Sequence, residues 1–447
     1  MHSHGQPALL DDSPMAPMTA RATLERLHAA AIAGVDPART TAAAVHALAL
    51  RERGGVHVIA LGKAAAGMAT AAVAALARRG VEPAGGLVVA ATPARAPHPA
   101  VPVVVGDHPI PAARSLAAAR RLGDAAAAVG PDDLAVVLLS GGTSSLVGAP
   151  VAGLTGADLA ALTDALLGAG VDIAVVNATR RRVTRWGAGR LALALAPARV
   201  ACLVVSDVPG YGAALVGSGP CAPETLPIGD LLASLHDAGT WPRLPAAARM
   251  LLGAMRDGAR PDAPPPTDPA FARVTLELLA DNGIAVAAVA AAARAAGFAV
   301  LAHDEPLAGE ARALGERLAG VLAAGAPGTV HVWGGEPAVT LHDAPADALG
   351  GRMQELALAA AGALARTGAA ATLLAAGTDG RDGPTDAAGA VVDGGTWERI
   401  ATAGRDPAAD LAAHRSHAAL DAAGALLRTG PTGTNVADVV IGLVGGP

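Results

Sequence analysis

The feature that most constrains this chain is an apolar run, residues 56–61, which meets a helical pattern after only a glycine and a lysine. Such a run predicts a buried strand, and the alanine-rich residues that follow predict a helix. The turn between them presents the free N–H groups of a helix start, which favour an anion. Lys63 lies in this turn and is the only lysine among 33 basic residues. Its compact ammonium is predicted to contact a phosphate group. The alternative is that the composition of this chain simply favours arginine over lysine at all the remaining basic positions.

The same alternation of strand and helix patterns continues along the chain. Apolar runs end in glycine-rich loops, and helical patterns separate them. This order predicts mostly parallel or mixed sheets flanked by helices, with ligands at the carboxyl ends of the strands. Strands are expected at residues 86–91, 134–139, 198–205, 299–301, 330–333, 371–376 and 439–443.

The division into domains follows from composition. Residues 258–269 are rich in proline and are interpreted as an interdomain linker. We therefore expect a polar tail over 1–18, a Rossmann-like domain over 19–257 and a second α/β domain over 270–447. The predicted fold class is α/β, with two α/β domains and an active site in the cleft between them.

Two local expectations accompany this division. One helical pattern covers residues 19–53, where apolar positions recur at helical spacing up to a pair of glycines. Residues 338–341 are expected to form a hairpin with the strand that ends near residue 333.

Composition excludes several classes of function. A net charge of −6 gives no electrostatic case for binding nucleic acid or an anionic membrane. No apolar run approaches the ~18 residues that span a bilayer. The two cysteines lack metal or disulfide spacing, which is typical of a reducing compartment. We expect a soluble cytoplasmic protein that binds small molecules.

A loop rich in glycine and hydroxyl groups follows the strand at 134–139. Ser140, Gly141, Gly142, Thr143 and Ser144 offer close backbone approach and several donors, which suit a phosphate or a carboxylate. The loop is not a Walker A motif, because the Gly-x-x-x-x-Gly-Lys order is absent. A plain strand-to-helix turn is the alternative.

Two charged residues lie at further strand or helix ends. Asp207 follows an apolar strand and is suited to accept a hydroxyl proton, although an aspartate before proline and glycine also caps turns. Arg352 opens a helix after two glycines and is suited to stabilise a phosphoryl group during transfer. An ordinary solvated arginine is the alternative there.

The loop over residues 377–386 places three carboxylates close together after a strand. Glycines make the loop tight, so that Asp379 and Asp382 are predicted to converge on Mg²⁺. The spacing is not that of an EF-hand, and a structural turn is the alternative. The histidines are scattered, and no zinc site is predicted.

Together these loops are similar to the motifs of the type II glycerate 2-kinase family, whose C-terminal half is called the MOFRL domain. The matching segments are Ala60-Leu61-Gly62-Lys63-Ala64-Ala65, His108-Pro109-Ile110-Pro111, Leu139-Ser140-Gly141-Gly142, Ser206-Asp207-Val208-Pro209-Gly210, Gly217-Ser218-Gly219-Pro220, Gly334-Gly335-Glu336, Gly350-Gly351-Arg352, Gly377-Thr378-Asp379-Gly380 and Thr432-Gly433-Thr434-Asn435-Val436.

The resemblance implies ATP-dependent phosphorylation of D-glycerate to 2-phosphoglycerate, with Mg²⁺, in a cleft between two α/β domains. It places Lys63, Asp207 and Arg352 at the positions that the family uses for catalysis. We hypothesise that Arg180 and the 140–145 loop hold the substrate carboxylate. Further expected binding residues are Asn177, Ser218, Glu336 and Thr378.

The chain departs from the family pattern at several loops. Met353 replaces the usual asparagine after Gly-Gly-Arg, Tyr211 replaces an acidic residue, and Gly187 stands where the family has a lysine. These changes leave open another small 2-hydroxy acid or a sugar acid as the acceptor.

Two other functions also stay open at this point. One is a hydroxypyruvate reductase, against which the lack of Gly-x-Gly-x-x-Gly after a strand weighs. The other is a ligand-binding protein without catalysis. Assembly as a homodimer is an open expectation.

Overall fold

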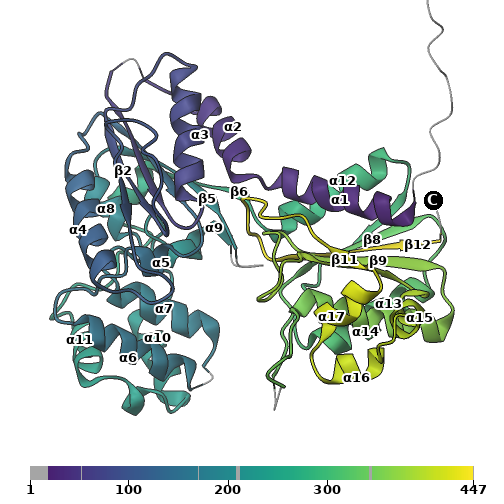
Figure 1. The fold of residues 1–447 in the computed structure, drawn as a ribbon. Helices are drawn as coiled ribbons and strands as arrows, with labels where there is room; N and C mark the ends of the chain where they lie inside the picture. The colour runs from purple at the N-terminus through teal and green to yellow at the C-terminus, as the bar shows by residue number, and fades with distance from the viewer. Residues whose placement is uncertain (1–18, 52, 170, 208–211, 342–344, 446–447) are drawn as a thin grey trace, which may run out of the picture.

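Two six-stranded sheets, each covered by helices on both faces, form the two lobes of the molecule (Figure 1). The computed structural model describes residues 19–51, 53–169, 171–207, 212–341 and 345–445. The predicted tail over 1–18 and Tyr211 lie outside the described residues. The expected α/β class, with strands flanked by helices, is confirmed.

The first sheet is wholly parallel, with the strand order β3-β2-β1-β4-β5-β6. All residues of β1 and β4 are buried, because helices cover both faces of a central parallel strand. Val58 and Ala60 face one apolar cluster, while Ile59 and Leu61 face the other. The strands are β1 (Val56–Leu61), β2 (Gly85–Ala90), β3 (Val103–Val105), β4 (Leu134–Leu139), β5 (Arg199–Val205) and β6 (Val274–Ala280).

Helices pack on both faces of this sheet, and a further group packs below it (Figure 1). Those on the faces are α2 (Pro37–Ala47), α3 (Ala65–Ala77), α4 (Ala113–Ala127) and α8 (Arg190–Leu195). The group below has an apolar core of its own and consists of α6 (Gly156–Leu167), α7 (Ile173–Val183), α10 (Ile228–Asp237) and α11 (Ala246–Arg256). This helical group forms one wall of the site described below.

The second sheet is mixed, with the order β11-β10-β9-β12-β8-β7, and only β7 and β8 are parallel. One face is covered by α1 and α12, and the other by α13 and α14. The elements are α1 (Ala20–Gly34), α12 (Asn282–Ala295), β7 (Ala299–Ala302), α13 (Ala311–Ala323), β8 (Thr329–Gly335), α14 (Arg352–Thr367), β9 (Ala371–Gly377), β10 (Gly389–Asp393), α15 (Thr396–Thr402), α16 (Pro407–Ala412), α17 (Ser416–Ala422), β11 (Leu426–Leu427) and β12 (Asp438–Val444).

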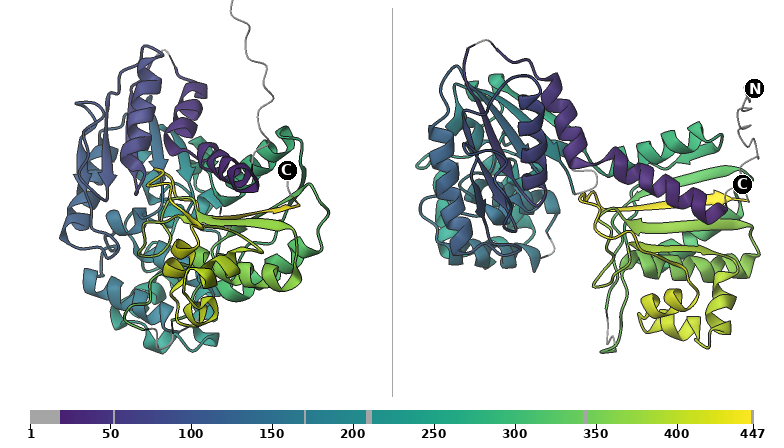
Figure 2. Two further views of the ribbon diagram at one scale, coloured as in Figure 1. Left: turned by 45° about the vertical axis from the view of Figure 1, so that its right-hand side comes forward. Right: turned by 45° about the horizontal axis from the view of Figure 1, so that its top comes forward.

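The chain crosses between the lobes twice, which differs from the predicted division. Helix α1 packs on the second lobe, and α2 then packs on the first, so the first described helix lies in the same lobe as the last described strand, β12 (Figure 2). Strand β6 lies beyond the predicted linker at 258–269, yet it pairs with β5 in the first sheet. The proline-rich segment is thus a loop of the first lobe, and the second crossing follows β6.

Two local predictions were wrong. The pattern over 19–53 forms two helices, because Asp36 caps the second one and Pro37 occupies its first turn. Residues 338–341 form no hairpin strand, since β8 already pairs with β7 and β12, and Ala338 makes only an isolated bridge to Glu310.

Within the described ranges, no helix has both the length and the apolar content needed to cross a bilayer.

His28 connects α1 to the second sheet. Its side chain is buried, and this burial lowers its pKa from 6.5 to about 4, against a hydrogen bond with the backbone of Gly377. The folded protein therefore keeps His28 neutral at a pH where the unfolded chain binds a proton.

We predict that His28 makes the free energy of unfolding fall as the pH drops from about 6.5 to about 4. Because the folded pKa lies below the unfolded one, the stabilisation is complete above pH 6.5 and is lost on acidification, by at most about 3 kcal/mol. Urea titrations at several pH values should show a smaller pH slope for His28→Asn than for the wild type. His46→Asn, at an exposed position on α2, is the control; equal slopes in all three proteins would contradict the prediction.

Candidate functional site

The turn after β1 is held against the loop after β4. Gly62 has φ +126°, and a Cβ there would lie 2.5 Å from the carbonyl oxygen of Ser140. The Lys63 N–H donates to the Gly141 carbonyl (2.9 Å), and the Ala64 N–H donates to Ser140 Oγ (3.0 Å). The Ser140 hydroxyl oxygen therefore satisfies a free N–H at the start of α3, while the Lys63 side chain is exposed to the cavity described below.

Asp207, directly after β5, packs its carboxylate over the same loop. A Cβ on Gly141 would lie 1.8 Å from Asp207 Oδ2, so a larger residue at that position would displace the carboxylate. Burial raises the pKa of Asp207, and the charge of Glu336 adds to this, while the charge of Lys63 partly offsets it. A carboxylate with a raised pKa is a stronger proton acceptor, as a general base requires.

His108 is a functional candidate that the sequence analysis did not select. A Cβ on Gly142 would lie 3.1 Å from Lys63 Cγ and 3.2 Å from His108 Cδ2, so both side chains lie over this glycine. Burial and then the charge of Lys63 lower the pKa of His108, against the charge of Asp207. The imidazole is thus neutral at pH 7 and can donate one hydrogen bond. The only signal in the sequence was its place in a His-Pro-Ile-Pro segment.

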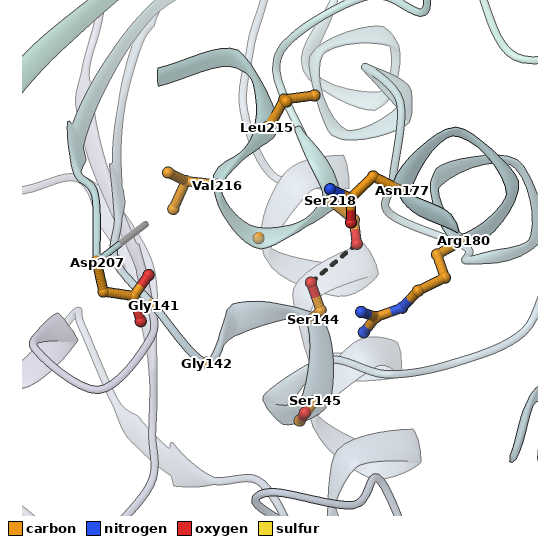
Figure 3. A pocket seen from close by; sticks show the side chains of 11 residues that line it. Gly141, Gly142, Ser144, Ser145, Asn177, Arg180, Asp207, Leu215, Val216 and Ser218 are labelled. Atoms are coloured by element: carbon orange, nitrogen blue, oxygen red, sulfur yellow. Dashed lines mark hydrogen bonds between the residues drawn. The ribbon is translucent and has the colours of Figure 1, made fainter. Parts of the chain in front are cut away.

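A first cavity of about 260 Å³ opens beside Asp207 (Figure 3). Its wall consists of Gly141 and Gly142, the short helix α5 (Thr143–Leu146), α7 and the turn over 215–218. The hydroxyl oxygens of Ser144 and Ser218 are 2.8 Å apart on this wall. Asn177 and Arg180 lie one turn apart on α7 and face the same cavity.

The guanidinium of Arg180 has no partner among the described residues. It points into the cavity toward Ser144 (Figure 3), and its side chain makes no hydrogen bond or ion pair to that part of the chain which the structure describes. Burial alone lowers the pKa of Arg180. A partly desolvated cation without a counter-charge is costly unless a ligand supplies one. This cavity is therefore suited to an anion such as a carboxylate.

A second cavity, of about 240 Å³, lies between the lobes. The first lobe contributes Lys63 and Asp207, and the second lobe contributes Gly433, Thr434 and Asn435 from the loop before β12. Asp207 also lines the first cavity, so its carboxylate separates a space facing Arg180 from a space facing Lys63.

Arg352 lies at the start of α14 in the second lobe and lines neither of these two cavities. Its Nε donates to Asp438 Oδ2 (2.5 Å), its Nη2 to Asp438 Oδ1 (3.3 Å) and its Nη1 to Glu336 Oε1 (2.8 Å). Burial raises the pKa of Asp438 to about 7, although its bond to Arg352 opposes the shift. The charge of Glu336 in this cluster also helps to raise the pKa of Asp207 in the first lobe.

The two predicted metal ligands differ in what their carboxylates contact. Asp382 is buried, and its oxygens accept hydrogen bonds from the N–H of Met353 (3.1 Å) and of Gln354 (2.8 Å). It therefore caps α14 and does not fit a metal ligand. Asp379 Oδ1 accepts from Arg381 N–H (3.0 Å), and Oδ2 has no hydrogen-bond partner among the described residues. Only Asp379 retains an oxygen for an ion.

Two hydroxyl groups that were predicted to bind substrate or nucleotide form hydrogen bonds with the protein backbone. Thr143 donates to the carbonyls of Leu61 (2.9 Å) and Ser140 (2.8 Å). Thr378 donates to the Ala437 carbonyl (2.7 Å) and accepts from the Val436 N–H (2.9 Å). Both side chains are fully buried, so they fix the loops that carry the site and do not face its cavities.

The fold and the site define a two-lobed α/β protein in which Lys63 and Asp207 line a cavity between the lobes. Residues 23–253 match a family described as a domain of unknown function, DUF4147, and residues 329–438 match the MOFRL family. The crystal structure of a glycerate kinase from Thermotoga maritima superposes with a TM-score of 0.83 at 31% identity, covering 95% of this chain and 99% of that one.

Curated relatives extend over nearly the same length. The D-glycerate 2-kinase of Thermotoga maritima is 32% identical over 401 residues, covering 87% of this chain and 90% of the relative. A protein of Agrobacterium vitis with the provisional name hydroxypyruvate reductase is 37% identical over 437 residues, covering 96% of this chain and 95% of the relative. The chain belongs to the glycerate kinase family with a C-terminal MOFRL domain.

We predict that Asp382→Ala destabilises the protein because two buried N–H groups at the start of α14 lose their acceptor. The loss of unfolding free energy should be about 2 kcal/mol, as for other helix caps with buried donors. Asp379→Ala, in the same loop, is the matched control and should cost less in thermal melts. Adding Mg²⁺ without nucleotide should leave the wild-type melting temperature unchanged; a rise that Asp382→Ala abolishes would show that Asp382 binds the metal.

Proposed function

We propose that the protein is a D-glycerate 2-kinase that transfers the γ-phosphoryl group of ATP to the 2-hydroxyl of D-glycerate. The observation that carries this proposal is the position of Asp207, which lines both the cavity facing Arg180 and the cavity facing Lys63. A base between an acceptor space and a donor space is what direct phosphoryl transfer requires. The glycerate kinases among the relatives supply the substrate class.

In the acceptor cavity, Arg180 binds the carboxylate of glycerate, and the hydroxyls of Ser144 and Ser218 provide further donors. Asp207 then accepts the proton of the 2-hydroxyl. The new bond forms between that oxygen and the γ-phosphorus, while the bond from the γ-phosphorus to the bridging oxygen of ATP breaks and ADP leaves. The raised pKa of Asp207 favours this proton transfer.

In the donor cavity, the Lys63 ammonium neutralises the γ-phosphoryl group. Neutral His108 lies beside Lys63 over Gly142 and can donate a hydrogen bond to the same group. Arg352, which Asp438 and Glu336 hold in place, acts from the other lobe when the cleft binds nucleotide. Bound Mg²⁺ would supply positive charge to the phosphates. Of the two predicted ligands, Asp379 is the one whose carboxylate retains an oxygen that could hold the ion.

A hydroxypyruvate reductase is the second candidate, because the relative from Agrobacterium vitis has that provisional name. The turn after β1 reads Gly62-Lys63-Ala64-Ala65-Ala66-Gly67, which lacks the close glycine pair of a dinucleotide-binding turn. Oxidation of NADH by hydroxypyruvate, at a rate comparable to kinase turnover, would favour the reductase.

We also propose a cytoplasmic location, which the two free, buried cysteines support. Homodimer formation stays a prediction for sedimentation to test.

We predict that Lys63→Met lowers kcat by about 10³-fold, because one well-placed cation contributes on this order to phosphoryl transfer. Lys63→Arg should recover only part of this loss, since the planar guanidinium cannot take the place of a compact ammonium. Circular dichroism melts should show both variants folded, as Lys63 is exposed. Near wild-type turnover by Lys63→Met would remove this residue from the mechanism.

The substrate assignment is tested by ADP release with D-glycerate, L-glycerate, D-lactate and gluconate as acceptors. We expect D-glycerate to be phosphorylated, and Arg180→Gln to lower kcat/KM for it by about 10- to 100-fold, because the carboxylate loses a charged hydrogen bond. Arg185→Gln, at an exposed arginine five residues further along, is the matched control. Equal effects of the two substitutions would contradict the role of Arg180.

A further inference from the structure

A third cavity, of about 200 Å³, adjoins the acceptor cavity on the far side of the 144–145 segment. It lies between the loop over 109–111 and helix α6. Ser144, Ser145 and Arg180 line both this cavity and the acceptor cavity, so Arg180 stands where the two meet.

The walls of this side cavity are largely apolar. The loop contributes Pro109, Ile110 and Pro111, and α6 contributes Leu159 and Ala160. The Ser145 hydroxyl donates to the Pro109 carbonyl (2.6 Å), which fastens this loop to the acceptor loop. Ile110 is 72% exposed at the rim, a large apolar side chain that nothing in the described structure covers.

The side cavity also has polar lining residues, namely Ser144, Ser145, Thr163, Asp164, Arg180 and Thr184. Thr184 donates its hydroxyl to the Arg180 carbonyl (3.0 Å) and so offers little to a ligand. Thr163 likewise donates to the Leu159 carbonyl (2.9 Å) within α6. Among the described residues that line this space, Arg180 carries a positive charge at the end shared with the acceptor cavity, and Asp164 on α6 carries a negative one. An anionic head with an apolar body matches this arrangement.

A 2-hydroxy acid has the geometry to use both cavities. Its carboxylate, its hydroxyl and its side group are all bonded to the same carbon atom, C2. When the carboxylate contacts Arg180 and the hydroxyl faces Asp207, the remaining substituent can turn past Ser144 and Ser145 into the side cavity. In glycerate this substituent is a short hydroxymethyl group, which leaves most of the apolar wall uncovered.

We propose that the side cavity is a subsite for the carbon chain of 2-hydroxy acids longer than glycerate, which the enzyme binds through Arg180 and phosphorylates. The proposal rests on the proposed function for its phosphorylation step, whereas its binding step does not. The occupant is an aliphatic D-2-hydroxy acid with a substituent of a few carbons, since the cavity is small and has an apolar wall formed by Ile110, Leu159 and Ala160.

Calorimetry on the full chain tests the binding step. The ligands are D-lactate, D-2-hydroxybutanoate, D-2-hydroxypentanoate and D-2-hydroxyhexanoate, which differ only in chain length. Burial of each added methylene should tighten binding about fourfold until the cavity is full. A constant or falling affinity along this series would overturn the proposal.

Two variants on α6 test whether the dependence of affinity on ligand chain length arises in the side cavity. Ala160→Phe places a ring in the side cavity and should make the affinity independent of chain length, while the affinity for D-glycerate stays unchanged. Ala161→Phe, at an exposed neighbour outside the cavity lining, should behave as the wild type. If the affinity of Ala160→Phe depends on chain length as in the wild type, the carbon chain of the ligand binds outside the side cavity, and the proposal is contradicted.

ADP release with the same acids separates this inference from the proposed function. Phosphorylation of the longer acids with a lower KM than that of D-lactate supports it. Tighter binding without phosphorylation, in a preparation that turns over D-glycerate, would overturn the substrate role of the subsite. A protein that phosphorylates neither D-glycerate nor the longer acids, yet binds the longer acids more tightly than D-lactate, would contradict the proposed kinase and leave the binding step supported.

Discussion

The site depends on the contact between the loops that follow β1 and β4. Gly62 and Gly141 bring two backbones and the carboxylate of Asp207 within distances that no Cβ would allow. Backbone hydrogen bonds from Lys63 and Ala64 then fix this contact. Because the three strands β1, β4 and β5 are adjacent and parallel, their loops meet at one edge, and the charges of Lys63 and Asp207 are held close without a long flexible segment.

The sequence allowed much of this edge to be predicted. Buried strands that end in glycine-rich turns are local features, so the positions of Lys63, the 140–145 loop and Asp207 follow from patterns within a few residues. The predictions that Asp382 binds a metal and that Thr378 binds a substrate do not fit the structure, because both side chains form hydrogen bonds within the protein. Their partners are the start of α14 and the loop before β12, which are close only in the folded chain.

The three consecutive arginines of α7 show most clearly which features could not be predicted from the sequence. Arg181 and Arg182 are buried beside Glu224 and Asp262, whereas Arg180 has no partner in the described structure. Nothing in the run distinguishes them, because the pairing is set by residues 40 to 80 positions away. The same is true of β6, whose place in the first sheet depends on β5 and not on the composition of the preceding proline-rich loop.

The two crossings between the lobes have a mechanical consequence. One runs between α1 and α2 and the other between β6 and α12, and neither sheet has a strand that belongs to both lobes. A rotation about this double connection would change the width of the space between Lys63 and the 433–435 loop without breaking a hydrogen bond inside either sheet. The architecture thus confines the hydrogen bonds that hold the site loops to each lobe, and makes the double connection the place where a change in the width of the cleft would occur.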